Sequence, residues 1–188
     1  MNTCECIVGI DLGTTNSEIA AFIDDNVKII GSGNTKMLPS CVGLSQTDEL
    51  LIGAPARNQQ LLYPDRTVRS IKRKMGTGES VTLGEKTFTP PEISALLLRE
   101  LTQWAQEKLG VAVQKAVISV PAYFSDAQRS ATREAGKLAG IYRGDRALMR
   151  ARVEAGVDFL RNHELVDPTN LAAIGFCFGG GMANALAV

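Results

Sequence analysis

Apolar and polar residues alternate in short blocks near the start of the chain and predict three strands. One apolar stretch runs from Cys6 to Leu12, a second from Ile19 to Ile23, and a third from Val27 to Ile30. The segments between them, Gly13–Ser17 and Asp24–Asn26, have the composition of turns. Because both connections are short, we expect an antiparallel meander.

The clearest helical pattern begins at Thr89 and ends at Gly110. Thr89 and Glu92 have the spacing of a capping box, and Pro90 stands at the first helical position. Glycine commonly ends a helix, so Gly110 marks the expected C-terminus. The apolar residues that recur on one face between these ends are Ile93, Leu96, Leu97, Leu101, Trp104 and Leu109.

A second strand and helix are expected next. Ala116–Val120 is an apolar run of strand length that stops at a proline. Ser125 and Gln128 repeat the capping-box spacing, so a helix should follow and reach about Ala139. Gly140 again has the position of a helix stop.

The rest of the chain predicts a helix, a strand and the start of another helix. Ala147–Leu160 has a helical pattern, Asp167-Pro168 is typical of a turn, and Leu171–Phe176 is a short apolar strand. Met182–Val188 has the pattern of a helix start. Strands thus alternate with helices, which predicts a mixed α/β architecture.

Composition indicates a globular protein of the cytoplasm. The chain has 188 residues, enough to bury a core, with 20 acidic and 20 basic side chains. This balance gives no electrostatic reason to expect a nucleic acid or a membrane surface as partner. Neither a membrane-spanning stretch nor the features of a secretion signal are found, so a cytoplasmic location is expected.

The four cysteines, Cys4, Cys6, Cys41 and Cys177, lack the dense spacing of a disulfide scaffold. We expect them to be reduced thiols. A metal site at the first two would need further ligands, and the sequence has a single histidine, His163, and no second close cysteine pair. A directly bound metal is therefore not expected there.

The segment GIDLGTTNS, residues 9–17, carries the first candidate chemistry. It joins two expected strands through a turn rich in hydroxyl groups, with Gly13 at the bend. A glycine lets the backbone approach a phosphate closely, so that N–H groups are aimed at its oxygen atoms. Taken alone, the same residues also fit an ordinary hairpin turn.

Two further blocks in the same order favour the phosphate turn. Together with SIKRKMG at residues 70–76 and VPAYFSDAQR at residues 120–129, the segment resembles the ATPase domain of DnaK-type heat-shock chaperones. The resemblance extends from about Ile7 to Gly140. It implies a partial lobe of the actin-like, ribonuclease-H-like ATPase fold, ATP or ADP with Mg²⁺ as cofactor, and co-chaperones as partners.

The resemblance also implies the roles of individual residues. Asp11 would help to hold the water shell of Mg²⁺, and Lys72 would be the catalytic lysine that stabilises charge near the γ-phosphate. Without the resemblance, Lys72 would be taken as a solvated lysine in a basic run. Pro121 and Arg129 would form a switch pair that couples the nucleotide state to a substrate domain. The implied nucleotide-binding set is Asp11, Gly13, Thr14, Thr15 and Asn16.

The chain departs from the chaperone pattern after Gly140. The next strand, a glutamate-proline-threonine block, a second glycine-rich phosphate turn, the adenosine pocket and the peptide-binding domain do not follow. The chain should therefore hold about one wall of the nucleotide cleft. We expect binding to be weak and turnover to be lost, because most of the differential binding of a transition state is missing.

A second candidate site lies in IGFCFGGG, residues 174–181. The pattern fits a nucleophile elbow, with Cys177 where G-x-S-x-G enzymes place serine and with the N–H of Phe178 as an oxyanion donor. A helix N-terminus at this point would lower the pKa of the Cys177 thiol. An inert cysteine in a glycine-rich loop is the open alternative.

With YRGDRALM at residues 142–149 and Asp167-Pro168, this segment resembles the middle of a dienelactone hydrolase, a cysteine-nucleophile member of the α/β-hydrolase fold. The resemblance implies no cofactor for this part. In that family the acid and histidine of the triad follow the elbow, whereas His163 precedes Cys177. We expect His163 to be a surface residue and the triad to be incomplete.

The sequence therefore predicts a chimera of two parts. Residues 1–140 would be a truncated DnaK-type nucleotide-binding domain, and residues 141–188 a hydrolase-like helix–strand–elbow–helix fragment whose strand Leu171–Phe176 joins the chaperone sheet. A gene fusion, a recombination product, an assembly error and a deliberate fusion remain open as origins. The favoured function is nucleotide binding by an incomplete chaperone ATPase; the alternatives are a hydrolase fragment and an inert fusion product.

Overall fold

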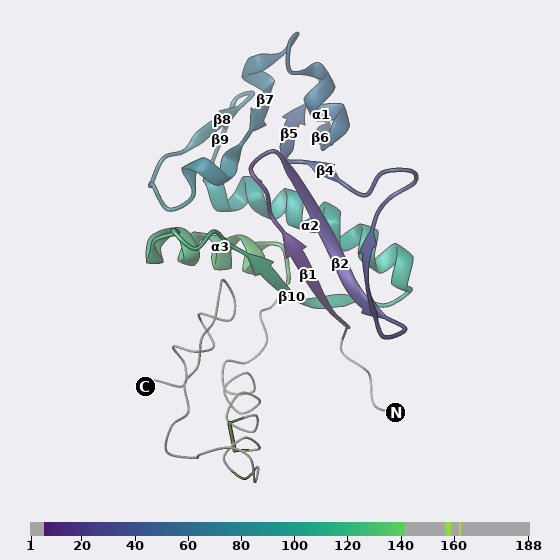
Figure 1. Cartoon of the computed structure of the whole chain (residues 1–188). Helices are drawn as coiled ribbons and strands as arrows, with labels where there is room; N and C mark the ends of the chain where they lie inside the picture. Colours follow the sequence, from purple (N-terminus) through teal and green to yellow (C-terminus); the bar gives the residue numbers. More distant parts are fainter. Residues whose placement is uncertain (1–5, 142–156, 159–161, 163–188) are drawn as a thin grey trace. The chain divides into compact units, whose positions relative to one another are not determined.

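The computed structural model describes residues 6–141, 157, 158 and 162 (Figure 1). The chain divides into two compact units, Met1–Val120 with Phe124–Arg143, and Pro121–Tyr123 with Gly144–Val188. Val157 and Asp158 are helical, and the other elements predicted beyond residue 141 lie outside the described residues. The fold described below is that of the first unit.

The predicted meander is confirmed. Strand β1 (Cys6–Asp11) pairs antiparallel with β2 (Asn16–Ile23), and β2 pairs antiparallel with β3 (Asn26–Ile30). Asp24 and Asp25 both have positive φ, 49° and 59°, as a two-residue type I′ hairpin turn requires. The first turn is shorter than expected, because β2 already begins at Asn16.

A parallel strand completes this sheet. Strand β10 (Val113–Ser119) pairs parallel with β1, and the order is β10-β1-β2-β3, with the short β4 (Leu38–Pro39) also paired to β2. The strand was expected at Ala116–Val120, but it begins three residues earlier and ends one residue earlier. Gln114 and Lys115 conceal its start, since they interrupt the apolar pattern.

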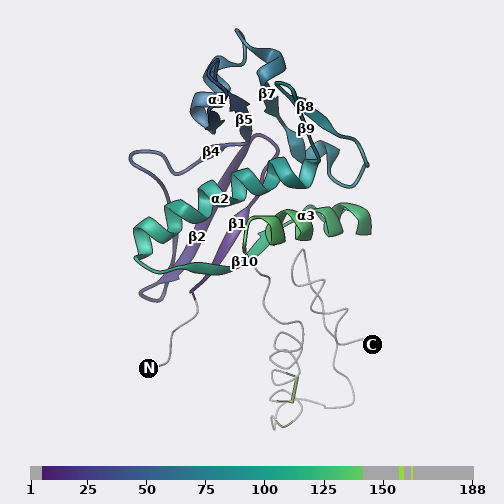
Figure 2. The same ribbon diagram turned by 180° about the vertical axis from the view of Figure 1, so that it is seen from behind.

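Two helices cover one face of the sheet (Figure 2). Helix α2 (Pro90–Leu109) and helix α3 (Asp126–Leu138) both have complete capping boxes, as the sequence predicted. Gly110 follows α2 with φ of 68°. On the apolar face of α2, Leu97 and Leu101 are 0% exposed. Burial of one such side chain contributes about 1.5–3 kcal/mol, so this face anchors the core.

The segment between β4 and α2 forms a second layer of short elements, which the sequence pattern did not predict. It contains an antiparallel three-stranded sheet of order β6-β5-β7 and a two-stranded β8-β9 hairpin (Figure 1). Its elements are β5 (Cys41–Leu44), β6 (Leu50–Ile52), α1 (Ala54–Gln59), η1 (Pro64–Arg66), β7 (Thr67–Arg69), η2 (Ile71–Lys74), β8 (Val81–Leu83) and β9 (Lys86–Phe88).

The lysine-bearing helix implied by the resemblance is η2, a single turn of 3-10 helix. Gly76, just after it, has φ of 71°, and an added Cβ would lie 2.7 Å from the backbone nitrogen of Gln128. The chain after η2 therefore packs directly against the first turn of α3 through a residue that must be glycine. Within the part of the chain described, no helix is long and apolar enough to cross a membrane.

Candidate functional site

The turn between β1 and β2 is tight because Gly13 leaves no space for a side chain. A Cβ at this position would lie 1.9 Å from the carbonyl oxygen of Asn16. The backbone thus folds back on itself within a few residues, as the sequence predicted from a glycine at the bend. Thr14 is half-buried at the tip, and Thr15 is exposed.

Two buried hydroxyl groups fix this turn from beneath. Ser17 and Ser40 are 0% and 3% exposed, and their Oγ atoms lie 2.9 Å apart. The hydroxyl of Ser40 donates to the carbonyl oxygen of Gly13 at 2.8 Å, so Ser17 must donate within the serine pair. Ser17 Oγ also accepts from the N–H of Gly13 at 3.1 Å. Both backbone polar groups of Gly13 are therefore fixed by side chains.

Asp11 stands at the carboxyl end of β1, next to the turn. Its partner in the parallel ladder is Ser119 of β10, and the Ser119 hydroxyl donates to Asp11 Oδ1 at 2.6 Å. The Asp11 side chain is exposed. The carboxyl ends of parallel strands are where α/β sheets place their ligands, and Asp11 presents a carboxylate there with one oriented oxygen.

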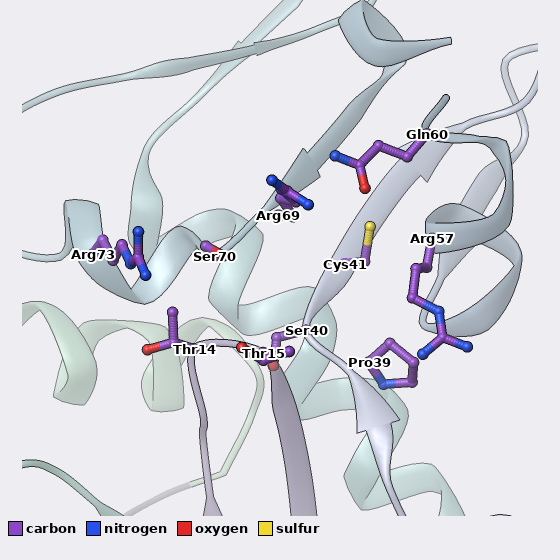
Figure 3. A pocket seen from close by; sticks show the side chains of 10 residues that line it. All are labelled: Thr14, Thr15, Pro39, Ser40, Cys41, Arg57, Gln60, Arg69, Ser70 and Arg73. Atoms are coloured by element: carbon purple, nitrogen blue, oxygen red, sulfur yellow. The ribbon is translucent and has the colours of Figure 1, made fainter. Parts of the chain in front are cut away.

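A cavity of about 290 Å³ adjoins the turn (Figure 3). Thr14 and Thr15 form one wall, and residues of α1, β5, β7 and η2 form the others. Three of the lining side chains are arginines, and no Asp or Glu lines it. The lining residues are Thr14, Thr15, Pro39, Ser40, Cys41, Arg57, Gln60, Arg69, Ser70 and Arg73.

Cys41 is the one thiol among these lining residues. It is 3% exposed, and burial raises the pKa of its thiol, while the neighbouring charges of Arg69 and Arg57 lower that pKa in part. Figure 3 shows the Cys41 sulfur between the side chains of Arg69 and Arg57. The thiol is thus protonated near neutral pH.

Lys72 lies in η2, between two residues that line the cavity, Ser70 and Arg73. Its Nζ atom is 5.6 Å from the centroid of the Phe124 ring, a cation–π distance. Ser70 begins the turn with φ of 55°, a left-handed conformation that is uncommon for a residue with a side chain. The structure therefore brings the lysine-bearing segment and the Thr14–Thr15 turn to walls of one cavity.

The two residues of the implied switch pair lie in different units. Arg129, in α3, donates from Nε to the carbonyl oxygen of Phe124 at 3.0 Å. Phe124 therefore contacts both Arg129 and Lys72. Pro121 is part of the segment Pro121–Tyr123, which belongs to the second unit.

The residues of the second candidate site, Cys177 and Phe178, and His163 with them lie outside the described residues. Among residues 6–141, 157, 158 and 162, no group of three or more His, Cys, Asp or Glu side chains could hold a metal ion directly. A carboxylate that acts through water molecules, as implied for Asp11, would not form such a group.

Sequence reasoning missed the residues that support the turn. Ser119 was placed in a strand without a role, and Ser17 and Ser40 were not connected. The parallel pairing of β1 with β10 sets Ser119 opposite Asp11, and this register is evident only in the folded chain. Arg57, Arg69 and Arg73 meet only in the folded chain, and no spacing in the sequence indicates them.

Comparison with known families agrees with this geometry. The model of the Hsp70 protein family matches residues 7–81 and 77–143, and that of the dienelactone hydrolase family matches residues 116–188. The chain belongs to the Hsp70 protein family. The second match overlaps the first over residues 116–143 and extends to residue 188, further toward the N-terminus than the resemblance from Tyr142 indicated. The two matches support a DnaK fragment joined to a dienelactone hydrolase fragment, as the sequence predicted.

Curated relatives support the same conclusion. The chain is 52% identical over 142 residues to the chaperone protein DnaK of Thermosipho africanus, which covers 74% of this chain and 24% of the relative. It is 50% identical over 139 residues to DnaK of Thermotoga neapolitana and of Thermotoga maritima, covering 73% of this chain and 23% of each relative. The chain spans about a quarter of the length of these relatives, and its matched region is a partial Hsp70 ATPase-like region.

Proposed function

We propose that residues 6–141 bind the phosphate groups of a Mg²⁺-bound adenine nucleotide, ATP or ADP, at the turn between β1 and β2. The observation that carries this proposal is the fixed backbone of Gly13. An added Cβ there would collide with Asn16, and both of its polar groups are bonded to buried serines. Such a turn keeps one shape with or without a ligand, which lowers the entropic cost of binding.

The residues present fit a magnesium nucleotide. Mg²⁺ prefers oxygen ligands and usually keeps several of its water molecules. Asp11 offers an exposed carboxylate beside the turn, oriented by Ser119 at 2.6 Å. Asp11 therefore holds the water shell of the ion, while Gly13, Thr14, Thr15 and Asn16 contact the phosphates. The bound ion would neutralise phosphate charge.

Lys72, in η2, would supply a positive charge. The charge of an ammonium group near the terminal phosphate would stabilise negative charge that develops there. The ring of Phe124 restricts the position of the Lys72 side chain, since the Lys72 Nζ atom lies over the ring, 5.6 Å from its centroid. The described residues act on one side of the phosphates, so the proposal is nucleotide binding with little or no turnover.

We also propose the division of the chain that the sequence predicted. We assign residues 1–140 to a truncated nucleotide-binding domain and residues 141–188 to a hydrolase-type fragment. We propose Pro121 and Arg129 as the switch pair of the first part and co-chaperones as its protein partners. The second part offers Cys177 as a nucleophile with the Phe178 N–H as oxyanion donor, and fast reaction of Cys177 with a thiol reagent near neutral pH would support that role.

Hydrogen exchange tests the nucleotide proposal on the intact chain. Mg-ADP should slow amide exchange in the peptides that contain Gly13–Ser17 and Ser70–Met75, because ligand binding suppresses local opening. The β8–β9 hairpin serves as the internal control and should not change. Equal exchange of the turn with and without saturating Mg-ADP would refute the proposal.

A further inference from the structure

The cavity beside the turn carries an uncompensated positive charge. Arg57 lies in α1, Arg69 ends β7, and Arg73 lies in η2, and all three line the cavity. In the described part of the chain, the salt bridges involve Lys28, Arg66 and Lys74, and none of these three arginines. Three guanidinium groups therefore share one cavity without a carboxylate.

Backbone geometry places these arginines around the cavity. Arg69 is the register partner of Cys41 in the β5–β7 ladder, so both side chains project from the same face of that sheet. Arg73 follows the left-handed turn at Ser70. Helix α1 begins after Gly53, where an added Cβ would lie 2.5 Å from the Leu38 side chain, so the helix that carries Arg57 packs closely on β4.

The size of the cavity limits its ligand. Its volume of about 290 Å³ lies just below the range for drug-sized ligand pockets, about 300–1,000 Å³. Beside the arginines it offers hydroxyl groups of Thr14, Thr15 and Ser70, and the amide of Gln60. Guanidinium groups bind phosphate oxygens through paired hydrogen bonds, and hydroxyl groups complete such sites. A compact anion with several negative charges fits this lining.

We propose that the Arg57–Arg69–Arg73 cavity is a second anion site that binds a compact multiply charged phosphate, of which pyrophosphate is the simplest probe. The site shares Thr14 and Thr15 with the turn but contains neither Asp11 nor Lys72. Its charge comes from the arginines, so binding does not require Mg²⁺. Such an anion would relieve the repulsion among the three guanidinium groups and stabilise the fold around α1, β5 and β7.

Calorimetric titration with sodium pyrophosphate in EDTA tests the proposal directly. Saturable binding is expected for the full chain, and it should weaken about tenfold in Arg57→Gln and in Arg69→Gln, because each loses charge-assisted hydrogen bonds. Arg133→Gln, an exposed arginine of α3, is the matched control and should bind like the unchanged chain. Absence of binding at matched ionic strength, or equal binding by all variants, would overturn the proposal.

A competition experiment distinguishes a separate pyrophosphate site from a site for the phosphate chain of the nucleotide. If the cavity is a second site, pyrophosphate still binds saturably in the presence of saturating Mg-ADP. Because Thr14 and Thr15 adjoin both ligands and the two anions repel each other, its affinity should fall, but by no more than about tenfold. Displacement of pyrophosphate by Mg-ADP would assign the cavity to the phosphate chain of the nucleotide and refute a second site. Pyrophosphate binding without any Mg-ADP binding would support the cavity while rejecting the nucleotide proposal.

The thiol in the cavity gives a readout that needs no variant. Pyrophosphate should slow the alkylation of Cys41 by iodoacetamide, followed by peptide mass spectrometry, because the Cys41 sulfur faces the cavity (Figure 3). Cys6, which lies at the start of β1 and does not line the cavity, is the internal reference. An unchanged ratio of Cys41 to Cys6 alkylation at saturating pyrophosphate would contradict the proposal.

Discussion

Lys72 and Phe124 are in contact, with the Nζ atom 5.6 Å from the ring centroid. Phe124 is buried, and its carbonyl oxygen accepts a hydrogen bond from Arg129 at 3.0 Å. Two residues that the sequence assigned to different roles, the catalytic lysine and one half of a switch pair, therefore meet at the same phenylalanine. Phe124 thus connects η2 with α3, in addition to the close packing of Gly76 on Gln128.

A double-mutant cycle measures this contact. Lys72→Met and Phe124→Leu should each lower the free energy of unfolding, and their effects should couple by about 0.5–1 kcal/mol, as expected for a partly exposed cation–π pair. Urea denaturation of both single variants and the double variant gives this coupling energy. Strictly additive effects would show that the ring does not hold the ammonium group.

The serine pair beneath the turn predicts a stability effect. Ser40→Ala removes the donor to the carbonyl oxygen of Gly13 and the acceptor for the Ser17 hydroxyl, and both are buried. The loss should be about 1–3 kcal/mol in the free energy of unfolding, because unsatisfied buried groups are costly. Ser80→Ala, at an exposed position, should change it by less than about 0.5 kcal/mol. Equal effects of the two substitutions would contradict the network.

Gly13 and Gly9 form a matched pair of glycines on either side of Asp11. Gly13→Ala places a Cβ 1.9 Å from the Asn16 carbonyl oxygen, whereas the nearest atom to a Cβ at Gly9 is 4.0 Å away. Thermal unfolding should show a loss of roughly 1–3 kcal/mol for Gly13→Ala, from the strain of overpacking. Gly9→Ala should be tolerated, and a turn that accepts both alanines equally would be inconsistent with this geometry.

The capping box of α2 predicts a pH dependence. Hydrogen bonds from the backbone N–H and the hydroxyl of Thr89 lower the pKa of Glu92 in the folded chain. The stabilisation is thus fully present above the ordinary pKa of glutamate, about 4.3. It is lost as the pH falls through the lower folded pKa.

The test compares the unchanged chain with Glu92→Gln, which keeps the shape of the cap without the charge. The unchanged chain should be more stable at pH 7, and the difference should vanish in acid. Glu134→Gln, an exposed glutamate of α3, is the control. A difference between the unchanged chain and Glu92→Gln that does not change with pH would exclude the charged cap as its cause.

Local signals predicted the parts of the fold that local interactions determine. The capping boxes at Thr89 and Ser125 fixed the starts of α2 and α3, because those hydrogen bonds join residues three apart. The layer from Cys41 to Phe88 was missed, since strands of three or four residues show too little alternation to be recognised. Its order depends on tertiary packing around α1 and η2.

The candidate site was predictable where resemblance supplied it and hidden where distant residues meet. Asp11 and the Gly13–Asn16 turn lie where the sequence placed them, at the end of β1. Ser40, 27 positions from Gly13, and the arginines of the cavity come together only through the pairing of β2 with β4 and of β5 with β7. The hydrophobic periodicity of a sequence does not indicate contacts of this kind, because they arise from the pairing of strands that are far apart in the chain.

The central claim is that the turn still binds a nucleotide in this partial Hsp70 chain. Isothermal titration of the folded chain with Mg-ADP measures it most directly, with Asp11→Asn as the test variant and Asp25→Asn, in the exposed β2–β3 turn, as the control. The account predicts saturable binding that Asp11→Asn weakens about tenfold and Asp25→Asn leaves unchanged. A folded chain that releases no heat of binding, or binding insensitive to Asp11→Asn, would contradict it.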